Sequence, residues 1–408
     1  MTERLRVVLF CTVFPNPAQP GLGIFVRERL RHLAPHVDVT VVAPVPWFPG
    51  AHLLRKNYRP RVVRREEQDG LPVLHPRFLS FPGIFKSLDG VLLALSSLAC
   101  LWRLRRRFPF KLIDAHFCYP EGVAACLLGW FMRVPVTITL RGTLPKLARY
   151  RLRRWQMAWA LRRCDALFAV ARSLLDAAVA IGAPPGKGVV APNGVDVEKF
   201  PAIPQDLARS ALGLPAQGEI VISVGALTAR KGFQRIIRLL PRLLERFPRL
   251  SLVVVGGPSV EGDNRAQLEA LANRLGVAER VRLTGSQPHA ELHKWLSAAD
   301  CFCLATANEG WANVLGEALA CGLPVVTTDV GGNREVVDSP AVGMVVPFGD
   351  EEALYQALAT ALERRWDRSA IRARAVQRNW QATASIIVPV FRAAALRRSP
   401  AASCMEAG

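Results

Sequence analysis

Two glutamates, Glu309 and Glu317, lie eight residues apart in the segment 308–335, which reads NEGWANVLGEALACGLPVVTTDVGGNRE. An apolar run, 300–305, precedes Glu309 and predicts a buried strand, and helix-forming residues resume at Asn313. Glu317 then falls on the second turn of the predicted helix, so both carboxylates can face one ligand. Backbone amides at a helix start attract a diphosphate, while carboxylates accept hydrogen bonds from hydroxyls. The segment therefore predicts a pocket for a nucleotide sugar.

Two adjacent cations, Arg230 and Lys231, occur in the segment VGALTARKGFQ. They lie between a predicted strand, 219–224, and a helix that we expect to start near Phe233. Cations in this position can bind a diphosphate by charge-assisted hydrogen bonds. Lys231 is the stronger candidate, because the side chain of Arg230 could point to solvent.

Three features of the amino-terminal half are candidates for ligand contact. Gly21 and Gly23 lie between a strand and a helix, where a backbone without Cβ can come close to a ligand, although a simple turn explains them equally well. His116 follows a strand and precedes a helix, at the edge where open α/β sheets bind ligands. It is either an acceptor-site group or a satisfied structural histidine. Arg141 follows the next strand, in TLRGTLP, and its permanent charge prevents it from acting as a base.

Short β-branched runs alternate with helical patterns along the whole chain, which predicts parallel sheets joined by crossover helices. Strands are predicted at 5–10, 37–43, 112–115, 134–140, 166–170, 219–224, 251–255, 281–284, 300–304, 324–327 and 344–346. Helices are predicted, among others, at 25–34, 122–132, 150–163 and 173–181. A segment with three prolines and an Asn-Gly turn, 192–205, predicts a domain junction. We therefore expect an α/β protein made of two Rossmann-like units.

The segment around the two glutamates resembles the donor-site signature of GT4 retaining glycosyltransferases. In that signature a glutamate, seven residues and a second glutamate precede a Cys-Gly-Leu-Pro-Val-Val run, which is 321–326 here. The Pro-Asn-Gly-Val-Asp segment, 192–196, is similar to the one that ends the first domain of GT4 enzymes. The resemblance covers nearly the whole chain, whereas the spacing of the glutamates alone could arise from ordinary helix-dipole partners.

The resemblance implies the GT-B fold, in which two Rossmann-like domains face each other across a cleft. It implies an acceptor-side domain, 1–200, and a nucleotide-sugar-binding domain, 201–377. The final helix, 378–397, is expected to pack back on the first domain, and the tail, 398–408, to be disordered.

The resemblance also implies roles for single residues. Glu309 would meet hydroxyls of the donor sugar, and Glu317 would hold the ribose. The loop VGGNREVV would lie on the donor side, although its glycines would also suit a tight strand-to-helix connection. Further donor contacts are expected at Gly310, Trp311, Ala312, Asn313, Gly23 and Gly332.

The chain departs from the GT4 pattern at two positions. GT4 enzymes often place an arginine directly after the strand glycine, where this chain has Ala226, while the lysine five positions later matches Lys231. Arg230 could supply the missing charge. Many GT4 enzymes have a histidine, in a His-Gly-Thr-Asp run, where this chain has Arg141. Arg141 could instead bind an anionic donor sugar, an acceptor phosphate or the leaving diphosphate, and the group that deprotonates the acceptor stays open.

The chain is strongly basic, with a formal net charge of +20 and a sequence pI near 10.5, which favours anionic partners. Cations cluster at 103–111 and again at 146–163, where no acidic residue occurs. In the second cluster Trp155 and Trp159 are four positions apart and share a helix face, and this basic amphipathic pattern suits lipid head groups. A solvated helix whose tryptophans pack inward is the alternative.

Other features limit the classes of site and the location. The nine cysteines are scattered without a Cys-x-x-Cys pair, so we expect buried reduced thiols, a cytosolic compartment and no metal site. The amino terminus predicts a first buried strand instead of a signal sequence. No stretch reaches about eighteen uncharged apolar residues, the nearest being 90–102, so we expect no transmembrane helix.

These features predict a retaining, metal-independent glycosyltransferase that needs no cofactor and uses a UDP- or GDP-linked donor. The expected acceptor is a sugar or a lipid-linked or cell-surface polysaccharide intermediate, and the expected location is the cytoplasm, peripherally on the inner face of the cell membrane. A nucleotide-sugar epimerase of the same fold is an alternative. A basic nucleic-acid-binding protein is another, but no helix-turn-helix, zinc finger or aromatic-rich RNA motif is visible, so no nucleic-acid partner is expected.

Overall fold

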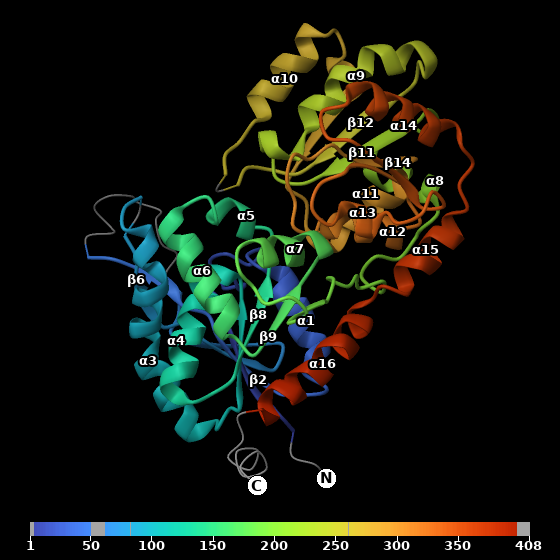
Figure 1. Cartoon of the computed structure of the whole chain (residues 1–408). Coiled ribbons are helices and arrows are strands. Elements are labelled where there is room, and N and C mark those ends of the chain that lie inside the picture. Colours follow the sequence, from blue (N-terminus) through green and yellow to red (C-terminus); the bar gives the residue numbers. More distant parts are fainter. Residues whose placement is uncertain (1–3, 50–61, 82, 260, 398–408) are drawn as a thin grey trace. The chain divides into compact units, whose positions relative to one another are not determined.

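The computed structural model describes residues 4–49, 62–81, 83–259 and 261–397 (Figure 1). These residues form two compact units. The first runs to Asn193 and includes the carboxyl-terminal segment from Trp380, and the second is Gly194–Asn379. The division falls inside the Pro-Asn-Gly-Val-Asp segment. The predicted tail, 398–408, lies outside the described residues.

The first unit is built on an eight-stranded sheet with the order β10-β9-β8-β7-β1-β2-β5-β4. All neighbouring strands are parallel except β4, which pairs antiparallel with β5. Its strands are β1 (Arg6–Phe10), β2 (Asp38–Val42), β4 (Arg65–Gln68), β5 (Leu71–Leu74), β7 (Leu112–His116), β8 (Val136–Leu140), β9 (Ala166–Ala169) and β10 (Gly188–Val190). A two-stranded parallel sheet is added by β3 (Val45–Trp47) and β6 (Arg77–Leu79). The central strands are buried along almost their whole length, as expected for a sheet covered by helices on both faces.

Helices cover this sheet. They are α1 (Ile24–Leu33), α3 (Asp89–Arg107), α4 (Val123–Met132), α5 (Leu144–Leu147), α6 (Arg151–Arg163), α7 (Arg172–Ala180) and α16 (Trp380–Leu396). The last of these lies beside α1 (Figure 1). Phe391 of α16 packs edge-on against Phe168, with ring centroids 5.7 Å apart, and Thr383 Oγ1 donates a hydrogen bond to the carbonyl of Pro192. Apolar packing thus fixes the carboxyl-terminal helix to the first unit.

The second unit has a fully parallel six-stranded sheet with the order β13-β12-β11-β14-β15-β16. Its strands are β11 (Ile220–Val224), β12 (Ser251–Val255), β13 (Val281–Gly285), β14 (Cys301–Leu304), β15 (Val325–Thr328) and β16 (Gly343–Val346). Its helices are α8 (Gln205–Leu212), α9 (Phe233–Arg246), α10 (Arg265–Arg274), α11 (Leu292–Ala298), α12 (Asn313–Ala320), α13 (Asn333–Val336), α14 (Glu351–Glu363) and α15 (Arg368–Val376). Two hydrophobic cores result, one containing residues of α9, α10 and α14 and the other residues of α11, α12 and α15.

The helix α9 shows how the sequence directs this packing. Its buried positions follow the helical repeat and form one apolar stripe, which consists of Phe233, Ile236, Ile237, Leu239, Leu240 and Leu243. Arginines occupy other positions of the same helix and remain near solvent.

Both the predicted α/β class and the two Rossmann-like units are confirmed. Each predicted strand is present, with its ends shifted by at most two residues. The sequence analysis missed the hairpin of β4 and β5, because the polar run Arg65–Gln68 lacks the alternation of a half-buried strand. It also missed β3, β6 and β10, which are only three residues long.

One helix among the described residues, Lys86–Arg107, is long and apolar enough to cross a membrane, by length and composition only. The sequence analysis expected no transmembrane helix because the longest uncharged apolar stretch is 90–102; this helix reaches its length by including charged residues, among them Asp89 and the arginines of its last turn. In the first unit α3 packs against α4 and β6, and its residues Leu93 and Leu101 are completely buried.

Replacing a core leucine of α9 should test this packing. Leu240→Ala truncates a completely buried side chain. It should lower the free energy of unfolding by ~2–5 kcal/mol, because the cavity left by the missing atoms collapses only partly. Leu207→Ala on α8 removes an exposed leucine and should change it by less than ~0.5 kcal/mol. Urea unfolding followed by circular dichroism measures both, and equal losses in the two variants would contradict the packing of α9.

Candidate active site

The strand order of the second unit reverses between β11 and β14. From β11 the sheet continues through β12 to β13 on one side, and from β14 through β15 to β16 on the other. Open α/β sheets bind ligands at the carboxyl ends of the strands beside such a reversal. The loop after β11 carries Arg230 and Lys231, and the loop after β14 carries Glu309. The topology therefore brings the predicted cations and the first predicted carboxylate to one edge.

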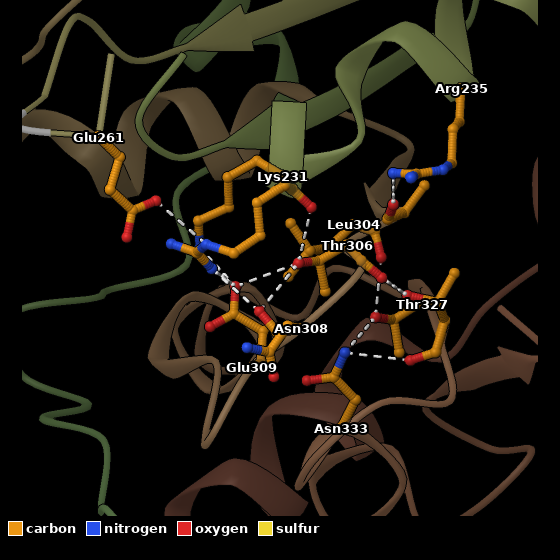
Figure 2. A network of polar contacts seen from close by, with 12 residues as sticks. Lys231, Arg235, Glu261, Leu304, Thr306, Asn308, Glu309, Thr327 and Asn333 are labelled. Atoms are coloured by element: carbon orange, nitrogen blue, oxygen red, sulfur yellow. Dashed lines mark hydrogen bonds and ion pairs between the residues drawn. The ribbon is translucent and has the colours of Figure 1, made fainter. Parts of the chain in front are cut away.

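These three side chains are in contact (Figure 2). Lys231 Nζ donates to Glu309 Oε1 at 2.7 Å, and Arg230 Nη1 donates to the same oxygen at 3.0 Å. Arg230 Nε also reaches Glu261 Oε2 at 3.2 Å. The side chains of Lys231 and Glu309 are 15% and 11% exposed to solvent, whereas that of Arg230 is 32% exposed. Two cations thus share one largely buried carboxylate oxygen, and Arg230 has a second carboxylate partner in Glu261.

The two loops are tied together by their backbones. Thr306 Oγ1 and the amide of Ala307 both donate to the carbonyl of Arg230, at 3.1 and 2.8 Å. At Gly232, where φ is +83°, a Cβ would lie only 1.9 Å from the carbonyl oxygen of Ala305. Only glycine permits this approach, so the sequence Lys-Gly positions the cations next to β14.

The glycine loop after β15 supports Glu309. The amide of Gly332 donates to the carbonyl of Gly310 at 3.1 Å, and a Cβ on Gly331, with φ +56°, would lie 1.9 Å from the carbonyl oxygen of Glu309. Both predicted glycines, Gly310 and Gly332, therefore hold the loop of Glu309 in shape. The amide of Gly332 is engaged inside the protein.

Glu317 lies on the second turn of α12, as the sequence predicts. Its Oε1 is 3.3 Å from Nε2 of His289, whose ring packs edge-on against Phe200. The residues before α12 face inward, since Ala312 is buried and Trp311 packs against the core. These residues, with Asn313 at the first position of α12, can offer a ligand mainly their backbone.

The first unit has its own reversal of strand order, between β1 and β7. His116 ends β7 and Arg141 follows β8. The ring of His116 lies between two partners, with Nε2 3.2 Å from Asp114 Oδ2 and Nδ1 3.3 Å from Arg141 Nη2. A guanidinium group can only donate, so Nδ1 accepts, and Nε2 carries the proton that is donated to Asp114. Arg141 Nη1 donates to Asn193 Oδ1 at 2.7 Å.

Burial fixes the charge states of this group. The completely buried ring of His116 has its pKa lowered to about 3, chiefly by desolvation, and is neutral near pH 7. Burial also lowers the pKa of Arg141 to about 9, so its guanidinium, stacked 4.6 Å above the ring of Phe25, remains charged. Both nitrogens of His116 are thus engaged within the unit, and the ring orients Arg141.

Gly23 directly precedes α1 with φ +68°, and a Cβ there would lie 2.2 Å from the carbonyl oxygen of Val13. A close backbone contact inside the first unit therefore accounts for this glycine. A Cβ on Gly21 would meet no atom within 4 Å.

Comparison with known proteins identifies the family. Residues 204–378 match the model described as Glycosyl transferases group 1, and residues 19–199 match Glycosyltransferase Family 4. A D-inositol 3-phosphate glycosyltransferase of Xylanimonas cellulosilytica is 30% identical over 406 residues, which cover 93% of each chain. The chain belongs to the GT4 family of glycosyltransferases. The Bacillus subtilis protein TuaC, whose name places it in teichuronic acid biosynthesis, is 27% identical over 338 residues, or 80% of this GT4 chain and 82% of TuaC.

Solved structures show the same GT-B fold. Sucrose-phosphate synthase from Thermosynechococcus elongatus superimposes on this GT4 chain with a TM-score of 0.74 at 21% identity, covering 95% of this chain and 98% of that one. The Anabaena protein HepE in complex with UDP and glucose gives a TM-score of 0.72 at 20% identity, covering 96% and 100%. The predicted family and fold are confirmed.

Two residues of this GT4 enzyme were missed by the sequence analysis. His289, the partner of Glu317, stands in a short turn after β13, and only its place after a strand could have indicated it. Glu121 is buried after β7 and accepts a hydrogen bond from the amide of Thr12 at 3.2 Å. Burial raises the pKa of Glu121 to about 7. Among the described residues, no group of three or more His, Cys, Asp and Glu side chains is placed to hold a metal ion.

The neutral state of His116 predicts a pH dependence of stability. The unfolded chain binds a proton at His116 below pH ~6.5, whereas the folded chain resists it down to about pH 3. The contribution of His116 to the free energy of unfolding is therefore fully present above pH ~6.5. It is lost as the pH falls, by about 2 kcal/mol at pH 5. Urea unfolding of the wild type and His116→Asn should show that their difference shrinks from pH 7 to pH 5, and a constant difference would contradict the assignment.

Proposed function

We propose that this glycosyltransferase moves a hexose, with retention of anomeric configuration and without a metal ion, from a UDP- or GDP-linked donor to a lipid-linked or cell-surface polysaccharide intermediate. The observation that carries the proposal is the convergence of Arg230 and Lys231 on Glu309 at the strand reversal of the second unit. The GT4 membership supports the transferase chemistry. The HepE complex with UDP and glucose supports a uridine nucleotide as the donor base.

The charges of the cluster suit a diphosphate. In this arrangement one carboxylate oxygen accepts from both cations, and phosphate oxygens, with more negative charge, can compete for the same donors. Glu309 would then be released toward the hydroxyls of the donor sugar. Glu317, steadied by His289, would accept hydrogen bonds from the ribose.

The same cations would act in the transfer step. As the bond between the anomeric carbon and the diphosphate oxygen breaks, negative charge grows on the leaving diphosphate. Lys231 and Arg230 are already held in place, so they can stabilise that charge without reorganising. Binding both substrates in the correct orientation supplies the rest of the rate enhancement.

Arg141 would receive an anionic group in the first unit. His116 orients its guanidinium and, being neutral, leaves the positive charge on Arg141. Relatives named for D-inositol 3-phosphate support an acceptor that carries a phosphate. We propose a cytoplasmic location at the inner face of the cell membrane, where a lipid-linked acceptor would be available.

Nucleotide binding tests the donor site. With chelator present, UDP or GDP should stabilise the protein against heat, by about 2.7 kcal/mol at a hundred times its Kd, and ADP should not. Glu317→Ala should lose much of this shift, because the ribose loses its acceptor. Glu245→Ala, an exposed glutamate on α9, is the matched control. A shift that survives unchanged in Glu317→Ala would refute the ribose assignment.

Removing the charge of Lys231 tests the transfer step. Lys231→Met should lower the rate of nucleotide release from the donor by roughly 10²–10³-fold, as expected for loss of a preorganised group at a developing charge. Lys294→Met on α11, paired only with a surface glutamate in the described contacts, should react at the wild-type rate. Conversion of the donor sugar without any acceptor would instead indicate an epimerase.

A further inference from the structure

The outer side of α3 is apolar although it faces solvent. Val91, Leu95, Ala99 and Trp102 are spaced three or four residues apart and are all exposed, with Leu95 at 66% and Trp102 at 49%. No charged side chain occurs in 90–102. A helix of a water-soluble domain normally carries polar residues on its exposed face, so this pattern requires another explanation.

The end of α4 extends this apolar surface. Phe131 lies beside Trp102, with ring centroids 6.1 Å apart, and both Phe131 and its neighbour Trp130 are more than half exposed. The helices α3 and α4 pack against each other in the first unit (Figure 1). We call the six residues Val91, Leu95, Ala99, Trp102, Trp130 and Phe131 the outer apolar face.

The exposed charged residues around the outer apolar face are all positively charged. All three acidic residues of the fully described segment 83–163, namely Asp89, Asp114 and Glu121, are buried. The exposed charged residues of that segment are all cations: Arg103, Arg106, Arg107, Lys111, Arg133, Lys146, Arg149, Arg151, Arg154, Arg162 and Arg163. Several of them flank the outer apolar face directly, at the end of α3 and after α4. Apolar and aromatic residues bordered by arginines are complementary to a bilayer surface with anionic head groups.

We propose that the outer apolar face docks on a bilayer containing anionic phospholipid, with α3 lying in the plane of the interface. Tryptophan and phenylalanine enter the boundary between head groups and acyl chains, and the arginines bind lipid phosphates. The opposite side of α3, with Leu93 and Leu101, stays packed on the first unit. The helix therefore does not span the membrane, although its length would permit it.

The outer apolar face differs from the membrane-binding surface that the sequence suggested. The basic helix α6 was the predicted site, but its Trp159 is half-buried and only Trp155 of that pair is exposed. On α3 the exposed stripe is apolar from Val91 to Trp102. The helix α6 adds cations, while α3 and α4 supply the inserted surface.

Vesicle binding by the full-length chain tests the proposal without any sugar donor, so its result is independent of the proposed transfer reaction. At about 0.1 M salt the protein should sediment with vesicles that contain about one-third phosphatidylglycerol, at least about tenfold more than with pure phosphatidylcholine. At about 0.5 M salt this preference should weaken. Lack of binding to anionic vesicles would overturn the proposal.

Matched variants test whether vesicle binding depends on the outer apolar face and not on other parts of the molecule. Leu95→Glu with Trp102→Glu should reduce vesicle binding at least about tenfold, because charged side chains cannot enter the interface. Leu207→Glu, at an exposed leucine of the second unit, should bind like the wild type. Arg106→Glu with Arg107→Glu, which leaves the apolar residues intact, should lose the preference for anionic lipid. Circular dichroism confirms that each variant is folded.

Three further results would overturn the proposal. The first is unchanged vesicle binding by the Leu95 and Trp102 double variant. The second is a wild-type dimer that the double variant converts to monomer, with no vesicle binding, since a second copy of the chain would then cover the face. The third is resistance of the vesicle-bound protein to alkaline carbonate extraction, which would indicate a spanning helix.

Discussion

Parallel pairing of β11 with β14 is the constraint on which the candidate active site depends. Parallel strands release the chain at the same edge of a sheet, so Lys231 and Glu309, which are 78 positions apart in the sequence, meet after these two strands. The glycine at 232 lets the first loop contact the second at a distance that any Cβ would forbid. Alteration of this pairing would separate the cations from the carboxylate.

Each unit brings two cations close together. In the second unit two cations share Glu309. In the first, buried Arg29 lies 3.7 Å from Asp114, and burial lowers the pKa of Arg29 as well as that of Arg141. A desolvated cation with incomplete pairing costs free energy, which an anionic ligand can offset.

Much of the fold followed from residue patterns. The buried β-branched runs located nearly every long strand, and the apolar stripes of α1, α4, α6 and α7 located those helices to within one residue at each end. The candidate donor site was also predicted from the sequence, since Arg230, Lys231 and Glu309 each stand in a loop that follows a predicted strand. The hairpin of β4 and β5 could not be predicted from the sequence. A polar edge strand such as β4 is stabilised by pairing with its partner and shows no pattern of its own in the sequence.

By itself, the sequence determined the α/β class, the two Rossmann-like units and the membership of the GT4 family, because periodic burial and contiguous motifs are local properties of the chain. Only the tertiary structure decided that His116 is sealed between Asp114 and Arg141, that His289 contacts Glu317, and that the open side of α3 is apolar. Contacts between residues far apart in sequence depend on the packing of other elements. The same holds for the buried side of α3, because this helix is apolar on both sides and no stripe marks one of them.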